Sequence, residues 1–158
     1  MLYHSNFIDC STINPTIMHI HRTLLTTLFV LFFTVLSAQT DRVFDTTIHN
    51  DEYKIYITLN LYDKNVQVPD QDVLGEVEGY IGSSQCRSKW LIVDSRMVND
   101  RTAELEVIND YGSEDFTAVL KMNNDGTYTF KKKNGSTLKF AVNRKWQKLP
   151  STFQLTKK

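Results

Sequence analysis

Histidine and cysteine are scarce in this chain of 158 residues. Beyond residue 38 the sequence holds one histidine, His49, and one cysteine, Cys86. A zinc site needs several such ligands at short spacing, and a Ser-His-Asp or Cys-His arrangement would have to use His49, whose polar neighbours read as a solvated loop. Glycine loops of the kind that hold phosphate are missing as well. We therefore expect no metal, no cofactor and no catalytic residue of these classes.

Charge is missing from one segment near the N-terminus. Residues 23–36 form an uncharged apolar run that follows a basic flank and ends just before the small residue Ala38. The run is shorter than the roughly 20 residues that cross a bilayer, and it fits a cleavable, helical signal peptide over residues 1–38. We expect cleavage near Ala38-Gln39, and a soluble product in the periplasm or outside the cell.

The signal is most compact if translation begins at Met18, which makes residues 1–17 an upstream extension. Residues 39–158 then form the exported chain, a length that suits one domain. A single cysteine cannot form an internal disulfide, so the domain must be held together by its core. We interpret Cys86, in a polar stretch, as a free thiol in a loop.

Alternating apolar and polar residues predict strands throughout residues 39–158, and no amphipathic helix is evident there. The clearest pattern lies at residues 116–142, where Asn124-Asp125-Gly126 and Asn134-Gly135 separate three alternating stretches. Such turn residues supply the positive φ angles of tight hairpins, so this segment predicts a three-strand meander. The expected fold class is all-β, with about eight short antiparallel strands in a small barrel or sandwich.

Acidic and basic residues are segregated along the exported chain. Residues 39–115 carry 16 acidic and 7 basic residues, whereas residues 116–158 carry 10 basic residues and one acid, Asp125. This asymmetry could indicate a basic tail that binds a partner. Because the basic residues alternate with apolar ones, oppositely charged strands lying side by side are the simpler explanation.

Tyrosines supply the best candidates for binding. Tyr56 and Tyr62 fall on the polar face of their strand, and Tyr80 falls with Glu76 and Glu78, so these rings should reach the outside. Exposed amphipathic rings favour contact with a partner or a sugar; otherwise they cover a sandwich or cap a barrel mouth. Trp90 and Trp146 are expected to anchor the core. The candidate ligand-binding residues are Tyr56, Tyr62, Tyr80, Trp90 and Tyr111.

Paired carboxylates leave an enzymatic alternative open. Glu76 with Glu78, and Glu104 with Glu106, each share a strand face. Two carboxylates can support glycoside hydrolysis, although acids spaced in this way more often form a solvated face. An outer-membrane β-barrel is a further alternative. Most of the expected strands, however, are shorter than the roughly 9–11 residues needed to cross a membrane.

The stretches DYGSEDFTA, DGTYTFK, GSTLKF and KWQKLP, with Ser37-Ala38-Gln39 at the end of the signal, resemble small exported β-proteins of Bacteroidota-type bacteria. The resemblance is strongest over residues 103–150. It implies export and a β-rich fold, and it carries no activity and no site residues. In architecture the chain is also similar to lipocalin-like barrels and periplasmic lysozyme inhibitors, although it lacks the paired cysteines usual there, and this similarity is analogy alone.

These observations favour an exported, non-enzymatic binding module, with an inhibitor-like action as one form of it, over a small glycan-acting hydrolase or a membrane barrel. The expected partner is a small ligand, a glycan or an envelope protein. We expect no binding of nucleic acid, no stable membrane insertion of the exported chain, and a monomer or weak homodimer.

Overall fold

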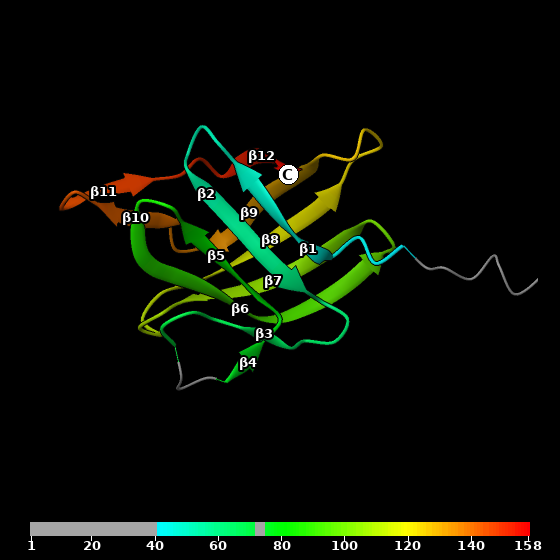
Figure 1. Cartoon of the computed structure of the whole chain (residues 1–158), viewed down its shortest axis with the longest axis horizontal. Coiled ribbons are helices and arrows are strands. Elements are labelled where there is room, and N and C mark those ends of the chain that lie inside the picture. The colour runs from blue at the N-terminus through cyan, green and yellow to red at the C-terminus, as the bar shows by residue number, and fades with distance from the viewer. Residues whose placement is uncertain (1–40, 72–74) are drawn as a thin grey trace, which may run out of the picture. The chain divides into compact units, whose positions relative to one another are not determined.

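The computed structural model describes residues 41–71 and 75–158. Within these ranges eight strands form a closed antiparallel barrel, each following its neighbour along the chain (Figure 1). This confirms the predicted all-β fold with about eight barrel strands, and decides for a barrel over a sandwich. The predicted signal peptide lies outside the described residues. The barrel strands are β1 (Asp45–Asn50), β2 (Ile55–Asn60), β5 (Gly79–Ser83), β6 (Cys86–Asn99), β7 (Thr102–Asn109), β8 (Asp115–Met122), β9 (Tyr128–Gly135) and β12 (Thr152–Lys157).

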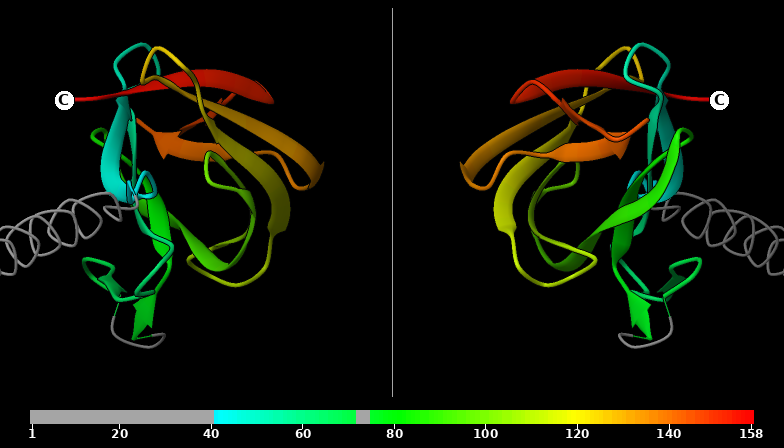
Figure 2. Two further views of the ribbon diagram at one scale, coloured as in Figure 1. Left: turned by 90° about the vertical axis from the view of Figure 1, so that its right-hand side faces the viewer. Right: turned by 90° about the vertical axis from the view of Figure 1, so that its left-hand side faces the viewer.

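Two small hairpins interrupt this order. The hairpin of β3 (Val66–Gln67) and β4 (Glu76–Val77) lies between β2 and β5, and the hairpin of β10 (Lys139–Val142) and β11 (Lys145–Lys148) lies between β9 and β12. The β10–β11 hairpin, orange in the side views, lies across one opening of the ring of strands (Figure 2). We refer to that opening as the hairpin end of the barrel.

The barrel interior is filled with apolar side chains. The rings of Trp90 and Phe116 lie 5.1 Å apart between centroids, Phe116 and Phe130 lie 6.3 Å apart, and Phe130 stacks on Phe153 at 4.8 Å. At the hairpin end the interior is closed by the buried side chains of Leu138 and Phe140. At the opposite end the interior is closed by Phe44 and by Tyr128, whose hydroxyl donates to the carbonyl of Val43 at 2.7 Å. Since apolar side chains fill the barrel from one end to the other, its interior is a packed core.

A bulge in β6 decides which of its side chains point outward. The pairing of β6 with β7 shifts between Ile92 and Asp94, which leaves Val93 without a partner in the ladder. Beyond the shift Asp94 lies opposite Glu106 on the outer face, and Ser95 lies opposite the buried Leu105. An extra residue in one strand reverses the alternation that follows it. The bulge therefore turns a serine toward the interior of the barrel.

The predicted three-strand meander is half correct. The turn at Asn124-Asp125-Gly126 does join β8 to β9, and Gly126 has a φ of 83°. The third stretch, however, pairs with β11 and not with β9. The hairpin that it forms turns at Asn143 and Arg144, with φ angles of 50° and 64° and no glycine. Alternation identifies a strand but does not identify its partner, and this explains the error.

Candidate functional site

The structure separates the five predicted aromatic residues into three places. Tyr56 and Tyr80 meet on the outside of β2 and β5, with ring centroids 5.9 Å apart. Trp90 and Tyr111 border one small hollow at the hairpin end. Tyr62 lies apart from both, beneath the guanidinium of Arg42. No single site therefore unites all five residues.

Tyr56 and Tyr80 belong mainly to a packed cluster on the outer face of the barrel. Tyr80 is only 8% exposed because the β3–β4 hairpin covers it, and it packs with Val68, Val77 and Leu91. The prediction that Tyr80 points outward is right, but the expectation that it is exposed is wrong. Partial burial, and then the neighbouring Tyr80, raise the pKa of Tyr56 above its ordinary value.

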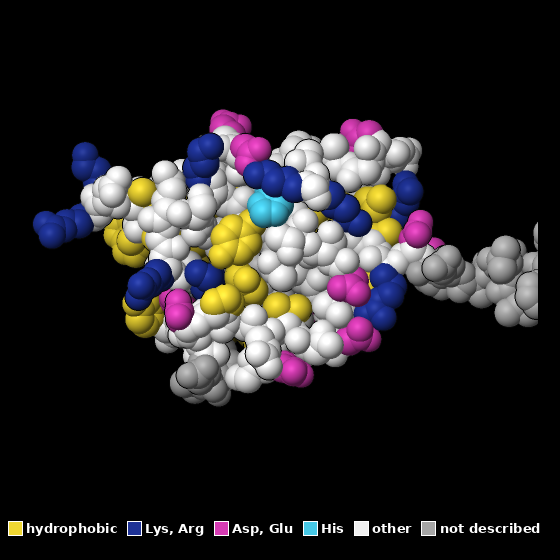
Figure 3. Space-filling model, in the orientation of Figure 1, with side chains coloured by type: hydrophobic (Ala, Val, Ile, Leu, Met, Phe, Trp, Pro, Cys, Tyr) yellow, Lys and Arg dark blue, Asp and Glu magenta, His cyan; other side chains and the backbone are white. Residues whose placement is uncertain are grey.

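His49 lies in β1 and not in the loop expected from its polar neighbours. Its ring lies 6.1 Å from that of Tyr56. Figure 3 shows this histidine at the margin of a hydrophobic surface. The side chains that form the cluster beneath are those of Val68, Val77, Tyr80 and Leu91, with Tyr56, Val66 and Ile108 packed against them.

Tyr62 helps to hold the segment that leads into β1. The Arg42 guanidinium lies 4.9 Å from the centroid of the Tyr62 ring, donates to Asn60 Oδ1 at 3.2 Å and makes a hydrogen-bonded ion pair with Asp63. Hydrogen bonds from Arg42 and then from Asn60 hold the pKa of the Asp63 carboxyl below its ordinary value. These contacts give Tyr62 a structural role.

The lowered pKa of Asp63 predicts how acid affects stability. A carboxyl whose pKa is depressed by folding stabilises the protein above its ordinary pKa, and this contribution is lost as the pH falls through the native value. We expect Asp63→Asn to lower the thermal midpoint at pH 7, and the difference from wild type to shrink steadily as the pH falls below about 4. Melting curves measured across this pH range test the prediction. Asp100→Asn, in an exposed turn, is the control, and a difference that stayed constant with pH would contradict the assignment.

The most exposed aromatic side chains lie together at the hairpin end. Tyr111 is 85% exposed and Trp146 is 64% exposed, and both border a hollow of about 40 Å³. The Nζ atom of Lys139 lies 5.0 Å from the centroid of the Trp146 ring and 2.7 Å from Oε1 of Glu114. Lys148 lies opposite Lys139 in the hairpin. We call Tyr111, Lys139, Trp146 and Lys148 the aromatic platform.

The fold of the hairpin explains why Trp146 is exposed. Phe140 on β10 is buried against the barrel, and the indole nitrogen of Trp90 donates to the carbonyl of Lys139 at 3.0 Å. Since side chains alternate between the two faces of a strand, Trp146 must then point away from the barrel. The prediction that Trp90 anchors the core is confirmed, and the same prediction for Trp146 is wrong. The sequence KWQK does not reveal which face of this hairpin is covered.

The loop that carries Tyr111 is ordered by its own side chains. Asn109 Oδ1 accepts the backbone N–H of Ser113 at 2.9 Å, and the Asp110 carboxylate accepts the N–H of Lys89 at 3.2 Å. Gly112 takes a φ of 66° within this turn. The Tyr111 ring is therefore carried by a loop with defined contacts, next to the carboxylates of Asp110 and Glu114.

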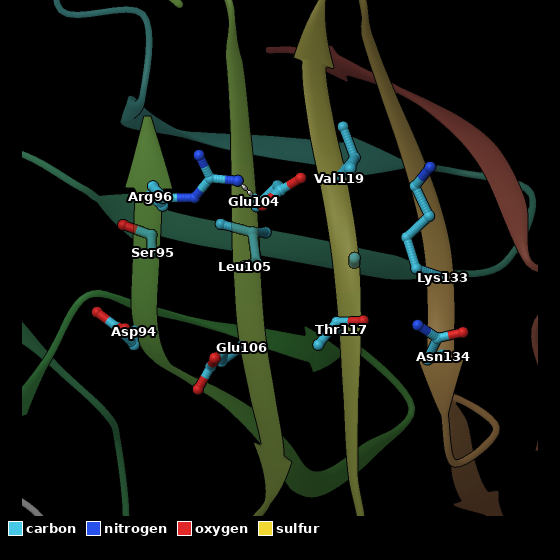
Figure 4. A pocket seen from close by; sticks show the side chains of 11 residues that line it. Asp94, Ser95, Arg96, Glu104, Leu105, Glu106, Thr117, Val119, Lys133 and Asn134 are labelled. Carbon is cyan, nitrogen blue, oxygen red and sulfur yellow. Dashed lines mark hydrogen bonds and ion pairs between the residues drawn. The ribbon is translucent and has the colours of Figure 1, made fainter. Parts of the chain in front are cut away.

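A larger hollow of about 490 Å³ lies on the outer face of β6 to β9. Figure 4 shows Glu104 and Glu106 on β7, flanked by Asp94 and Arg96 on β6. On the other side, β9 contributes a lysine and an asparagine. Glu104 is paired with Arg96. Glu104 and Glu106 lie side by side on one strand, whereas glycoside hydrolysis needs two carboxylates that flank the bond to be cleaved.

The other predicted carboxylate pair, Glu76 and Glu78, borders one hollow, but the two side chains differ in burial and only Glu78 has partners within the described residues. Glu76 is exposed, whereas Glu78 is 4% exposed. Glu78 accepts a hydrogen bond from the hydroxyl of Ser95 and lies 2.6 Å from Nζ of Lys64. A buried carboxylate needs such partners, and the β6 bulge supplies one of them by turning Ser95 inward. This buried group was not evident from the sequence.

Among residues 41–71 and 75–158, no group of three or more His, Cys, Asp or Glu side chains could hold a metal ion. The same residues include no helix with the length and apolar character needed to cross a bilayer. Comparison of the chain with protein-family models, with curated proteins and with solved structures found no match.

Proposed function

We propose that the protein is an exported, non-enzymatic binding module that engages its partner on the outside of the barrel, through the aromatic platform. The observation that carries this proposal is the exposure of Trp146 beside Tyr111. Tryptophan and tyrosine dominate the energetics of binding surfaces because each buries a large apolar area and keeps a polar group for hydrogen bonding. Two such rings exposed around one hollow form a surface suited to a partner.

The packing of the barrel supports an outer site over an inner one. A barrel that carries a small ligand inside needs an interior that its own side chains leave open. Here the interior holds stacked aromatic rings, and Leu138 and Phe140 cover the hairpin end. The platform, in contrast, is built on a hairpin anchored to the core by Trp90. A rigid support favours binding because less freedom is lost when the partner docks.

Affinity capture from the native envelope tests this proposal. The protein is expressed from its full sequence as wild type and as Trp146→Ala, and retained components are identified by mass spectrometry. We expect the partner to be retained by wild type and depleted at least about tenfold on Trp146→Ala, as for a central aromatic contact. Val98→Ala is the matched control, because Val98 is an exposed apolar residue on β6 that does not border the platform. Identical sets of components from wild type and Trp146→Ala would contradict the proposal.

A further inference from the structure

The β10–β11 hairpin carries positive charge that the fold does not neutralise. Residues 126–158 contain nine basic residues and no acidic one. Lys139 pairs with Glu114, but Arg144, Lys145 and Lys148 are exposed and make no ion pair within the described part of the chain. The expectation that oppositely charged strands lie side by side is therefore wrong for this hairpin. Its charge is available to an anionic partner.

Acidic groups nevertheless lie directly beside the platform. Asp110 and Glu114 border the same hollow as Tyr111 and Trp146. The surface therefore combines the flat ring of Trp146, unpaired cations on the same hairpin, and the carboxylates of Asp110 and Glu114, which can accept hydrogen bonds. A partner that uses the whole surface needs a flat apolar face, negative charge and hydrogen-bond donors.

We infer that the partner of the aromatic platform is an acidic polysaccharide, a chain of sugar rings that bear carboxylate groups. This inference rests on the proposed function and specifies the chemistry of the partner. The C–H face of a sugar ring is apolar and can stack on Trp146, while its hydroxyl groups can donate to Asp110 and Glu114. The carboxylates of the chain pair with Lys148 and with Arg144 at the hairpin turn.

The presence of both cations and carboxylates around Trp146 favours an acidic polysaccharide over other anionic partners. An acidic protein segment or an anionic lipid surface presents negative charge without a hydroxyl-rich ring that can both stack on Trp146 and donate hydrogen bonds to Asp110 and Glu114. A neutral polysaccharide could stack on Trp146, but it would leave the unpaired cations of Arg144 and Lys148 unused. The hollow of about 40 Å³ is also too small to enclose a small molecule, so it suits an extended chain lying across the platform better.

Titration with short oligogalacturonates tests the inference. Tryptophan fluorescence and calorimetry report binding. Trp90 borders the same hollow but is only 3% exposed, so most of the spectral change should come from Trp146 and be lost in Trp146→Phe. We expect Trp146→Ala to weaken binding at least about tenfold and Lys148→Gln to weaken it about two- to fivefold, with an affinity that falls as salt is added. Lys121→Gln is the control, since Lys121 is exposed on β8 at the other end of the barrel, and it should leave binding unchanged.

Three results would overturn the inference. They are binding of dextran as strong as that of oligogalacturonate, binding of poly-L-glutamate or anionic phospholipid vesicles as strong as that of oligogalacturonate, and no oligogalacturonate binding at all. Each leaves the proposed function standing if affinity capture still depends on Trp146. If capture does not depend on Trp146 and oligogalacturonate does not bind, both fail.

Discussion

Phe130→Ala should lower the free energy of unfolding by about 3–5 kcal/mol, the range found when a buried phenylalanine is truncated in a packed core. The Phe130 side chain is fully buried on β9. It stacks on Phe153 of β12 at 4.8 Å and meets Phe116 of β8 edge to face at 6.3 Å. Its removal leaves a cavity between the two strands that neighbour β9, so the loss should be close to the upper end of the range.

Chemical unfolding followed by circular dichroism measures this effect. Phe130→Leu is the matched control, because it keeps most of the apolar volume and should cost less than about 2 kcal/mol. Val98→Ala, at an exposed position, should change stability by no more than about 0.5 kcal/mol. A loss of less than about 1 kcal/mol for Phe130→Ala would be no more than the value of one buried methylene. It would show that the aromatic stack does not hold β8, β9 and β12 together.

Gly135→Ala should destabilise the barrel by about 2–4 kcal/mol, the combined cost of a strained backbone angle and a close contact. Gly135 has a φ of 86°, which L-residues rarely adopt. A Cβ atom there would lie 2.5 Å from the carbonyl oxygen of Asp115 and 2.7 Å from Cα of Phe116, and both are backbone atoms that cannot move aside. Strand β9 approaches β8 at this point, next to the irregular pairing between Phe116 and Ala118.

Gly126→Ala separates the two causes. Gly126 has nearly the same φ, 83°, but an added Cβ would meet no atom within 4 Å. It should therefore cost only about 1–2 kcal/mol, the backbone term alone. Unfolding free energies of both variants, measured under the same conditions, test the argument. Equal losses for the two glycines would show that the close approach of β9 to β8 contributes nothing to the effect.

Much of the barrel could be predicted from the sequence because alternation is a local property. Ile55, Ile57 and Leu59 alternate with polar residues, and all three are buried in the structure. The Asp125-Gly126 turn could be predicted equally well, since a positive φ favours glycine. Tyr56 and Tyr80 were placed on the correct face of their strands for the same reason, whereas Tyr62, predicted on the same strand as Tyr56, lies in a turn beyond β2.

The tertiary structure decided what covers each face. Tyr80 has the alternation of an exposed residue, but the β3–β4 hairpin buries it. Trp146 reads as a core residue, but Phe140 on the paired strand takes the inward position and leaves the indole outside. Which strand pairs with which depends on contacts between residues far apart in the chain, and single-sequence periodicity carries no information about them.

By itself, the sequence determined that residues beyond the predicted signal form an all-β domain without the histidine and cysteine clusters of zinc sites. Only the tertiary structure shows that the barrel is closed and that its interior is filled. It also shows that the two tryptophans differ in burial. Trp90 lies in the core and donates to the backbone of Lys139, whereas Trp146, on the hairpin so anchored, faces outward. The physical reason is that composition and alternation are local, while burial depends on which distant strand lies across the face.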